Sequence, residues 1–339
     1  MSVEHGDSEA GRHATEGRHA TEGRPSAARA MAAPRWQESF VTSSDGTRLY
    51  VRTTEASSTS SQSQARGVAS LSALLCDGIA CDGFVWRYLA DELAASVDVT
   101  HWNYRGHGRS HAPADPDRVD MGALVDDLEA VRAAKVRGPV VLFGHSMGCQ
   151  VALEGYRRRR EGIAGLVLIC GAPGRVTHTF RGSDALARTL PGLIERVERH
   201  PQLARALWSN LPPATATRVA LASGEVAAGV DPAALMPYME HAVSLDLRMF
   251  LRMLRSVGDD TAEDLLPAID VPVLILAGER DTFTPPERAE HMAAAIPGAE
   301  LVVLPGTTHI VPLERRDEVR EKITTFLRER VAARLNAGE

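Results

Sequence analysis

Apolar and polar residues follow one another along this chain in a rhythm that changes repeatedly. The segments QESFVT (37–42) and TRLYVRT (47–53) alternate with period two, which predicts an antiparallel pair of strands. Short apolar runs predict further, buried strands at 69–76, 98–102, 139–143, 165–170, 271–277 and 300–304. Helical spacing predicts helices at 85–95, 119–135, 147–160, 286–296 and 314–331. Strands that alternate with helices indicate an α/β fold, a mostly parallel, doubly wound sheet covered on both faces.

The alternation of strands and helices stops between about Arg175 and Glu263. Segments such as LIERVERHPQLARALW and YMEHAVSLDLRMFLRML have apolar residues at helical spacing and contain no convincing strand. We therefore predict an all-helical cap insertion between two strands of the sheet. The predicted organisation is a tail at 1–35, a core at 36–173 and 264–334, and a helical cap at 174–263.

Two stretches are poor in apolar residues. Residues 11–24, GRHATEGRHATEGR, duplicate a six-residue unit, and the tail that contains them is predicted to be disordered because it cannot offset its ordering entropy. The sequence does not decide whether Met1 or Met31 is the true start. The stretch EASSTSSQSQARG at 55–67 predicts a flexible hairpin loop.

Composition and charge exclude several classes of function. An apolar fraction of 44% is enough for a large core, and a net charge of −6 argues against a nucleic-acid surface. No apolar run approaches the ~18 residues of a membrane span, and the N-terminus lacks a secretory signal core. Cys76, Cys81, Cys149 and Cys170 show no metal or disulfide spacing. We expect a cytoplasmic protein with free thiols, no metal and no cofactor, whose oligomeric state the sequence leaves open.

A polar serine interrupts the segment VVLFGHSMGCQVALEG (140–155), between a predicted buried strand and a predicted helix. Ser146 has a glycine two residues away on each side, Gly144 and Gly148, which allows a turn too tight for β-carbons. A G-x-S-x-G turn exposes its hydroxyl at the carboxyl edge of a sheet, in front of a helix N-terminus. Ser146 is therefore a candidate nucleophile, and the alternative is an ordinary strand-to-helix corner.

A serine nucleophile needs a base and a group that orients the base. His309, in LVVLPGTTHIVPLE, and Asp281, in VPVLILAGERDTFTPPE, each follow a predicted strand. The order Ser146, Asp281, His309 is the chain order of the α/β-hydrolase triad. Glu279 is a rival for the acidic role, because residues two apart on a strand share a face.

Residues 37–332 resemble an α/β-hydrolase of the lipase and esterase type with a helical cap. The resemblance is carried by GHSMG around Ser146, RGHGRS at 105–110, GERDTFTPPE at 278–287 and PGTTHIVPLE at 305–314.

The resemblance implies a role for each candidate residue. It implies Ser146 as the nucleophile and His309 as the base and then the acid. The family's G-x-x-D spacing favours Asp281 over its rival as the orienting residue. The resemblance also implies an oxyanion hole made by the backbone N–H groups of Met147 and Ile79.

The predicted oxyanion loop departs from the family pattern. Where the family usually has His-Gly-X, this chain has Asp77, Gly78 and Ile79. A free carboxylate ~5 Å from the oxyanion, at an effective dielectric of about 20, would oppose it by about 3 kcal/mol, close to the value of one oxyanion-hole donor. The next loop, Asp-x-Arg-Gly in the family, has Asn103 before Arg105. We therefore hypothesise that Asp77 turns away from the pocket and accepts hydrogen bonds from Asn103, Arg105 or nearby backbone.

Other polar residues are predicted to be structural. His107, in RGHGRS, and His145, beside the serine, are expected to support the fold, and Cys149 is expected to pack in the core. Asp126 and Asp127 are expected on the solvated face of a predicted amphipathic helix.

The sequence as a whole indicates a serine hydrolase that cleaves a carboxylic ester, or a related acyl compound, of a small to medium apolar molecule through an acyl-enzyme. The same triad can perform carbon–carbon bond hydrolysis, acyl transfer or cofactor-free peroxidase or perhydrolase chemistry. A non-catalytic small-molecule receptor is the alternative from another class. Serine at the turn argues against haloalkane dehalogenases and epoxide hydrolases, which use aspartate there. The substrate itself cannot be identified from the sequence.

Overall fold

The computed structural model describes residues 34–56, 71–222 and 230–338, with the side chains of residues 219–222 left out of the description. The predicted disordered tail with its repeat, apart from its last two residues, and most of the predicted loop at 55–67 lie outside the described residues.

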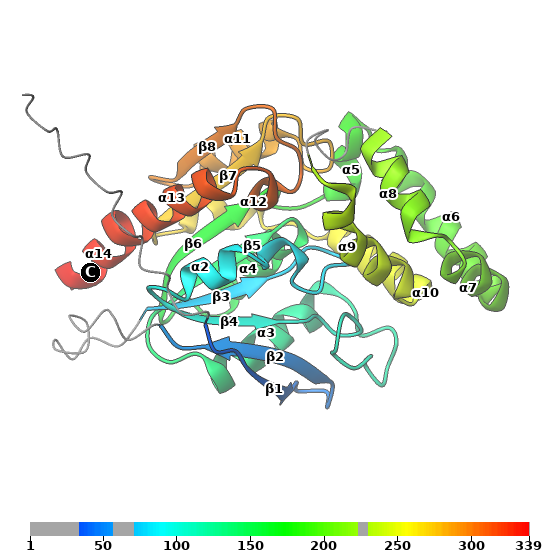
Figure 1. The fold of residues 1–339 in the computed structure, drawn as a ribbon, viewed down its shortest axis with the longest axis horizontal. Helices are drawn as coiled ribbons and strands as arrows, with labels where there is room; N and C mark the ends of the chain where they lie inside the picture. The colour runs from blue at the N-terminus through cyan, green and yellow to red at the C-terminus, as the bar shows by residue number, and fades with distance from the viewer. Residues whose placement is uncertain (1–33, 57–70, 223–229, 339) are drawn as a thin grey trace, which may run out of the picture. The chain divides into compact units, whose positions relative to one another are not determined.

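In the described part of the chain, eight strands form one sheet in the order β1-β2-β4-β3-β5-β6-β7-β8 (Figure 1). The strands are β1 (Gln37–Thr42), β2 (Arg48–Thr54), β3 (Ser72–Cys76), β4 (Asp98–Trp102), β5 (Val140–His145), β6 (Ile163–Ile169), β7 (Val273–Gly278) and β8 (Glu300–Leu304). β2 pairs antiparallel with β1 and with β4, and the other neighbours are parallel. The predicted mostly parallel α/β sheet is confirmed.

Helices cover the sheet on both faces. They are α2 (Leu89–Leu93), α3 (Met121–Lys135), α4 (Met147–Arg158), α11 (Pro286–Ala295), α12 (Val311–Glu314), α13 (Arg316–Phe326) and α14 (Ala332–Ala337). In β5, Val140 and Leu142 belong to the core shared with α3 and α4, whereas Val141 and Phe143 belong to the core shared with α2 and α13. Successive side chains of a strand point to opposite faces, so a strand buried on both faces reads as a continuous apolar run.

Two predicted helices differ in detail from the structure. The helix predicted at 85–95 is a 3-10 turn, Phe84–Trp86, followed by α2. The helix predicted at 314–331 is α13, which continues through a π-helical turn, Leu327–Val331, into α14. Periodicity registers which residues are buried, and it does not distinguish these hydrogen-bonding patterns from a regular α-helix.

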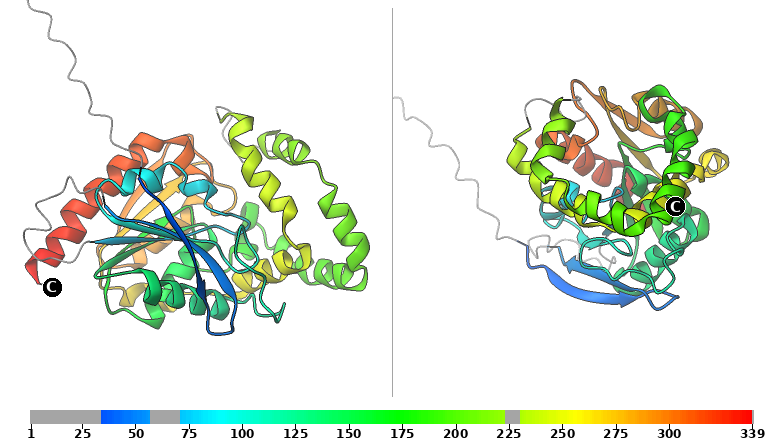
Figure 2. Two further views of the ribbon diagram at one scale, coloured as in Figure 1. Left: turned by 60° about the horizontal axis from the view of Figure 1, so that its bottom comes forward. Right: turned by 90° about the vertical axis from the view of Figure 1, so that its right-hand side faces the viewer.

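Six α-helices of the described part of the chain lie between β6 and β7. They are α5 (Val176–Thr179), α6 (Ala185–Arg199), α7 (Pro201–Ser209), α8 (Pro213–Ala222), α9 (Pro232–Ser244) and α10 (Leu247–Asp259). Figures 1 and 2 show these helices, coloured green to yellow, gathered beyond one end of the strands. Met249, Met253 and Val257 recur every four residues on α10 and pack into the core beneath. We propose that this group of helices is the cap predicted at 174–263.

None of the helices within the described ranges reaches both the length and the apolarity that a bilayer crossing requires.

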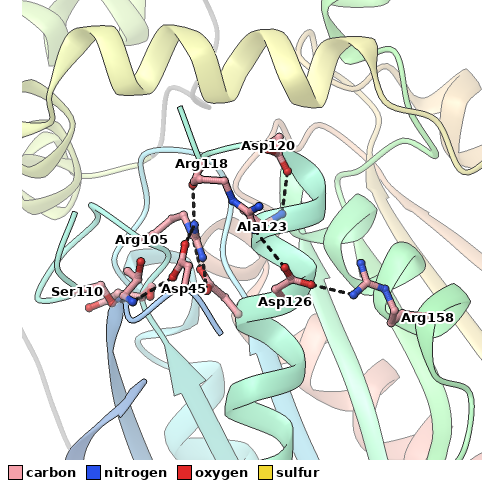
Figure 3. Close-up of polar contacts among 11 residues, drawn as sticks. Asp45, Arg105, Ser110, Arg118, Asp120, Ala123, Asp126 and Arg158 are labelled. Carbon is pink, nitrogen blue, oxygen red and sulfur yellow. Dashed lines mark hydrogen bonds and ion pairs between the residues drawn. The ribbon is translucent and has the colours of Figure 1, made fainter. Parts of the chain in front are cut away.

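Arg105 is fully buried and connects three segments of the core (Figure 3). Its Nε and Nη2 donate to the two carboxylate oxygens of Asp127 on α3, at 2.7 and 2.6 Å, and Nη1 donates to Asp45 of the β1–β2 turn at 2.8 Å. The expectation that Asp127 lies on a solvated face is therefore wrong, since its side chain is 0% exposed. A buried guanidinium needs a buried counter-charge, and α3 turns this carboxylate inward to supply it.

Asp126, the preceding residue, behaves as expected of an outer position. It pairs with Arg158 at 2.8 Å and with Arg118 at 3.3 Å, and its side chain remains 27% exposed (Figure 3).

The two neighbouring aspartates make a matched test of this buried pair. Asp127→Ala should lower the free energy of unfolding by about 3–5 kcal/mol, because it leaves a buried charge without its main partner. Asp126→Ala should cost at most about 1 kcal/mol, as is typical of exposed ion pairs. Urea unfolding of both variants measures the difference, and equal losses would contradict the assignment of Arg105 as a core anchor.

Candidate active site

Ser146 occupies the turn between β5 and α4, in a strained conformation. Its φ is 55° and its ψ is −121°, a region that residues other than glycine rarely adopt. Its N–H donates to the carbonyl of Ile169 at 3.0 Å, and its carbonyl accepts from the N–H of Cys149 at 3.0 Å. The side chain is half-buried and lines a cavity, whereas its neighbours on both sides are buried.

The two glycines around Ser146 are required by close packing. A β-carbon on Gly144 would lie 2.4 Å from the carbonyl oxygen of Gly148, and one on Gly148 would lie 2.2 Å from the carbonyl oxygen of Cys76 at the end of β3. Each distance is far shorter than a van der Waals contact. The G-x-S-x-G spacing therefore allows the first turn of α4 to pack directly against the end of the sheet.

His309 and Asp281 form a hydrogen-bonded pair on neighbouring loops. Nδ1 of His309 lies 2.8 Å from Oδ2 of Asp281, which follows β7, while His309 itself follows β8. The Asp281 carboxylate also accepts from the N–H groups of Phe283 and Thr284, at 2.8 and 3.0 Å. Burial, the largest effect, would raise the pKa of Asp281, but the charge and the hydrogen bond of His309, together with the hydrogen bonds from Thr284, hold this pKa below its ordinary value. An ionised Asp281 accepts the Nδ1 proton, which leaves Nε2 of neutral His309 as the free base.

Glu279, the rival acid, lies elsewhere. It is exposed, and its Oε2 accepts the N–H of Gly306 at 2.8 Å. Of the two candidate acids, the structure brings Asp281 to the imidazole.

Ser146 and His309 line one cavity of about 710 Å³ between the ends of the strands and the helices α5–α10. Residues of the sheet side include Ile79 and Met147, and the helical insertion contributes side chains such as Trp208 and Phe250, whose rings stack at 6.1 Å. No aspartate, glutamate, lysine or arginine lines it among the described residues. The cavity is thus apolar around a small group of reactive side chains, which is the usual character of a small-molecule site.

The loop that carries Ile79 is held by hydrogen bonds on both sides. The Tyr104 hydroxyl donates to the carbonyl of Asp77 at 2.8 Å. The N–H of Ala80 donates to Nε2 of His107 at 3.3 Å, which makes His107 an unprotonated acceptor at that nitrogen. These bonds fix the backbone beside Ile79, one of the two residues expected to supply oxyanion N–H groups; the other, Met147, begins α4.

Asp77 does turn away from the cavity, but its partner is His101. Oδ2 of Asp77 lies 2.9 Å from Nε2 of His101, and Nε of Arg52 donates to the other ring nitrogen at 3.2 Å. Nε2 therefore carries the proton and donates to the carboxylate. The hypothesis that Asn103 or Arg105 holds Asp77 is wrong. Asp77 is absent from the residues that line the cavity.

The partners of Arg105 explain part of the error, because its donors are occupied by the carboxylates described above. The Nδ2 donor of Asn103 has no hydrogen-bond partner among the described residues, and Oδ1 of Asn103 accepts the N–H of Arg109 at 3.2 Å. His101 was detectable as a polar residue inside the predicted strand 98–102, where a buried position requires a hydrogen-bond partner. The sequence pattern does not say which residue that partner is.

One group of side chains has the spacing of metal ligands. Ligand atoms of Cys170, Asp281 and His309 lie within 4.8 Å of one another. Burial and the charge of Asp281 raise the pKa of the Cys170 thiol well above its ordinary value, so the thiolate that a metal would need is disfavoured. The other two residues already bind each other. We therefore interpret Asp281 and His309 as a hydrogen-bonded pair and Cys170 as a neighbouring buried thiol, whose Sγ donates to the carbonyl of Thr308.

Comparisons with known proteins bear on the family and the fold of this chain. The sequence model described as "Alpha/beta hydrolase family" matches residues 74–322. Polyketide synthase ThaQ from Burkholderia thailandensis is 28% identical over 268 residues, 77% of this chain, which spans only 12% of that protein. The pimeloyl-[acyl-carrier protein] methyl ester esterase of Stenotrophomonas maltophilia is 26% identical over 256 residues, 75% of this chain and 92% of its own.

Among solved structures, an esterase from Exiguobacterium antarcticum superposes with a TM-score of 0.68. It is 22% identical, and the match covers 86% of this chain and 100% of that one. At this identity the likeness shows the fold alone.

The lowered pKa values of two buried histidines lead us to predict that the folded protein loses stability in acid. Burial, the largest cause, lowers the pKa of His107 and of His145 to about 4, against about 6.5 in an unfolded chain. Between those values the unfolded chain binds protons that the folded chain does not. The free energy of unfolding should therefore fall as the pH drops from about 6.5 toward 4, by up to about 1.4 kcal/mol per pH unit for each histidine.

Urea unfolding at pH 7, 6 and 5 measures this dependence. Replacing either histidine by glutamine should lower the slope of the free energy of unfolding against pH by the contribution of about one proton, or about 1.4 kcal/mol per pH unit. A slope that is unchanged in both variants would show that the folded protein does not exclude these protons.

Proposed function

The chain belongs to the alpha/beta hydrolase family, and we propose that it is a serine hydrolase that cleaves a carboxylic ester, or a related acyl compound, of a small to medium apolar substrate. The observation that carries this proposal is that Ser146 and His309 line one apolar cavity while Asp281 binds the far nitrogen of the imidazole. The relative named as a pimeloyl-[acyl-carrier protein] methyl ester esterase supports it.

In the proposed mechanism, Nε2 of His309 takes the proton of the Ser146 hydroxyl as its oxygen attacks the carbonyl carbon. The N–H groups of Met147 and Ile79 stabilise the oxyanion, and Asp281 stabilises the imidazolium. His309 then gives its proton to the leaving alcohol, and an acyl-enzyme remains on Ser146. Water, deprotonated by His309, then attacks this ester, and as the acid leaves, His309 returns the proton to the Ser146 oxygen.

The first test is hydrolysis of p-nitrophenyl esters of graded chain length by the wild type and by variants of the proposed triad. Ser146→Ala should lower the rate by about 10⁶-fold, as for the nucleophile of other serine hydrolases. Asp281→Asn should cost about 10⁴-fold, because it favours the wrong tautomer of His309. Glu279→Gln is the matched control and should stay within a few-fold of the wild type.

Other outcomes would redirect the proposal. Full activity in Ser146→Ala would exclude a serine nucleophile. A wild type that binds the esters without turnover would favour a receptor, or carbon–carbon bond cleavage on a different substrate.

The lining of the cavity also bears on the charge of the substrate. An ionised group buried there would lose its contacts with water, and among the described residues it would find none of the oppositely charged side chains that usually compensate a buried charge. The effective penalty for an unpaired buried ion is several kcal/mol.

An ester with a terminal carboxylate on its acyl chain should therefore be a poor substrate. We expect its kcat/KM to be about 100-fold or more below that of the same ester with a terminal methyl ester, which has similar length and no charge. Steady-state kinetics on the two compounds measure the ratio. A ratio below about ten would show that the acyl end reaches solvent or an ionic partner.

A further inference from the structure

We infer that His145 is a positioning residue that fixes the backbone of His309, and this inference rests on the function proposed above. Nε2 of His145 lies 2.8 Å from the carbonyl oxygen of His309, although 164 positions separate the two residues. A carbonyl oxygen only accepts hydrogen bonds, so Nε2 carries the proton and donates it. The His145 side chain is 2% exposed, which protects this bond from competition with water.

The segment that carries His309 needs such an anchor, because residues 305–310 form neither helix nor strand. Glu314 accepts both the N–H and the hydroxyl of Thr308, each at 2.6 Å, and so fixes the residue before the base. The bond from His145 acts on the backbone of His309 itself.

His309 is then held at two points that control different motions. Asp281 binds Nδ1 and sets the orientation of the ring, whereas His145 binds the carbonyl and sets the position of the main chain from which the ring projects. A base displaced by ~1 Å from its nucleophile loses about 100-fold in rate, so the second anchor has a direct consequence for proton transfer.

His145 also directly precedes Ser146 at the end of β5. One strand end therefore presents the proposed nucleophile and, through the adjacent side chain, holds the backbone of the proposed base. The positions of Ser146 and of the His309 backbone are therefore both set by the end of β5.

The environment of His145 keeps it in the donating form. Burial, and next the charge of His309, lower its pKa to about 4, so it is neutral at pH 7. Its other nitrogen, Nδ1, is buried without a hydrogen-bond partner among the described residues, beside Gly78, where a β-carbon would lie 3.0 Å away. If the proton moved from Nε2 to Nδ1, the hydrogen bond to the His309 carbonyl would be lost. The new Nδ1–H group would have no acceptor among the described residues.

The test compares two replacements of His145. His145→Phe keeps an aromatic ring and removes the donor, and it should lower kcat/KM for a p-nitrophenyl ester by about 10- to 100-fold, mainly through kcat. His145→Gln places an amide N–H near the position of Nε2 and should recover activity to within about fivefold of the wild type, with the KM of both variants changed by less than about threefold.

A third variant separates positioning from packing. Val141→Ala removes core packing from the same strand, on the face covered by α2 and α13, and should lower the melting temperature without lowering kcat. Equal activity in the phenylalanine variant and the wild type would overturn the inference. Equal losses in the phenylalanine and glutamine variants, in proportion to their loss of melting temperature, would overturn it too.

A measurement on the wild type covers the case in which His145→Phe does not fold. The ¹⁵N shifts of labelled histidine should show His145, assigned by its loss in His145→Gln, as a neutral ring protonated at Nε2 from pH 6 to 8. A ring protonated at Nδ1 would overturn the inference. Ser146→Ala, assayed in parallel, separates the two proposals: full activity there rejects the proposed function, whereas the outcomes above concern His145 alone.

Discussion

The site depends on how closely the first turn of α4 approaches the end of β3. With hydrogen in place of a side chain at Gly148, the helix lies against the carbonyl of Cys76, the last residue of that strand. The loop that follows Cys76 is brought beside the β5–α4 turn, where a β-carbon on Gly78 would lie 3.2 Å from Cβ of Ser146. This single contact sets the nucleophile candidate, the helix N-terminus and the neighbouring loop in one place. A larger residue at position 148 would separate all three.

Around this contact, hydrogen bonds hold the buried charged side chains in place. The Arg105 guanidinium is bound by carboxylates within the core, and the Asp77 carboxylate is bound by His101 on the side away from the cavity. Asp281 is the acid whose charge is directed to the site, through His309. Because electrostatic interactions are strong in a low-dielectric interior, an uncompensated charge near the proposed oxyanion would cost as much as one of the proposed donors contributes.

The sequence predicted the elements that depend on local pattern. Apolar residues recur with different periods in buried strands and in helices. The sheet, its parallel character and the helical segment between β6 and β7 could therefore be predicted from the sequence. Ser146, Asp281 and His309 could be proposed as candidates because each follows a strand whose carboxyl end meets the others at one edge. The partners of buried polar residues could not be read. Nothing in the text joins Asp77 to His101 or Asp127 to Arg105, because such pairs are set by the packing of segments distant in the chain.

Much of the cavity wall comes from a different part of the chain than the polar side chains of the candidate triad. Ser146, His309 and Asp281 belong to loops of the sheet, while Trp208, Phe250 and many other apolar lining residues belong to the helices between β6 and β7. Apolar residues of the sheet side, such as Ile79 and Met147, complete the wall. A large part of the shape of the site is therefore encoded apart from the proposed chemistry. Substitutions in the helices between β6 and β7 can change the range of substrates that the cavity accepts while the proposed reaction stays the same. Proteins with this arrangement can therefore acquire new substrates through substitutions in helices that take no part in the proposed proton transfer.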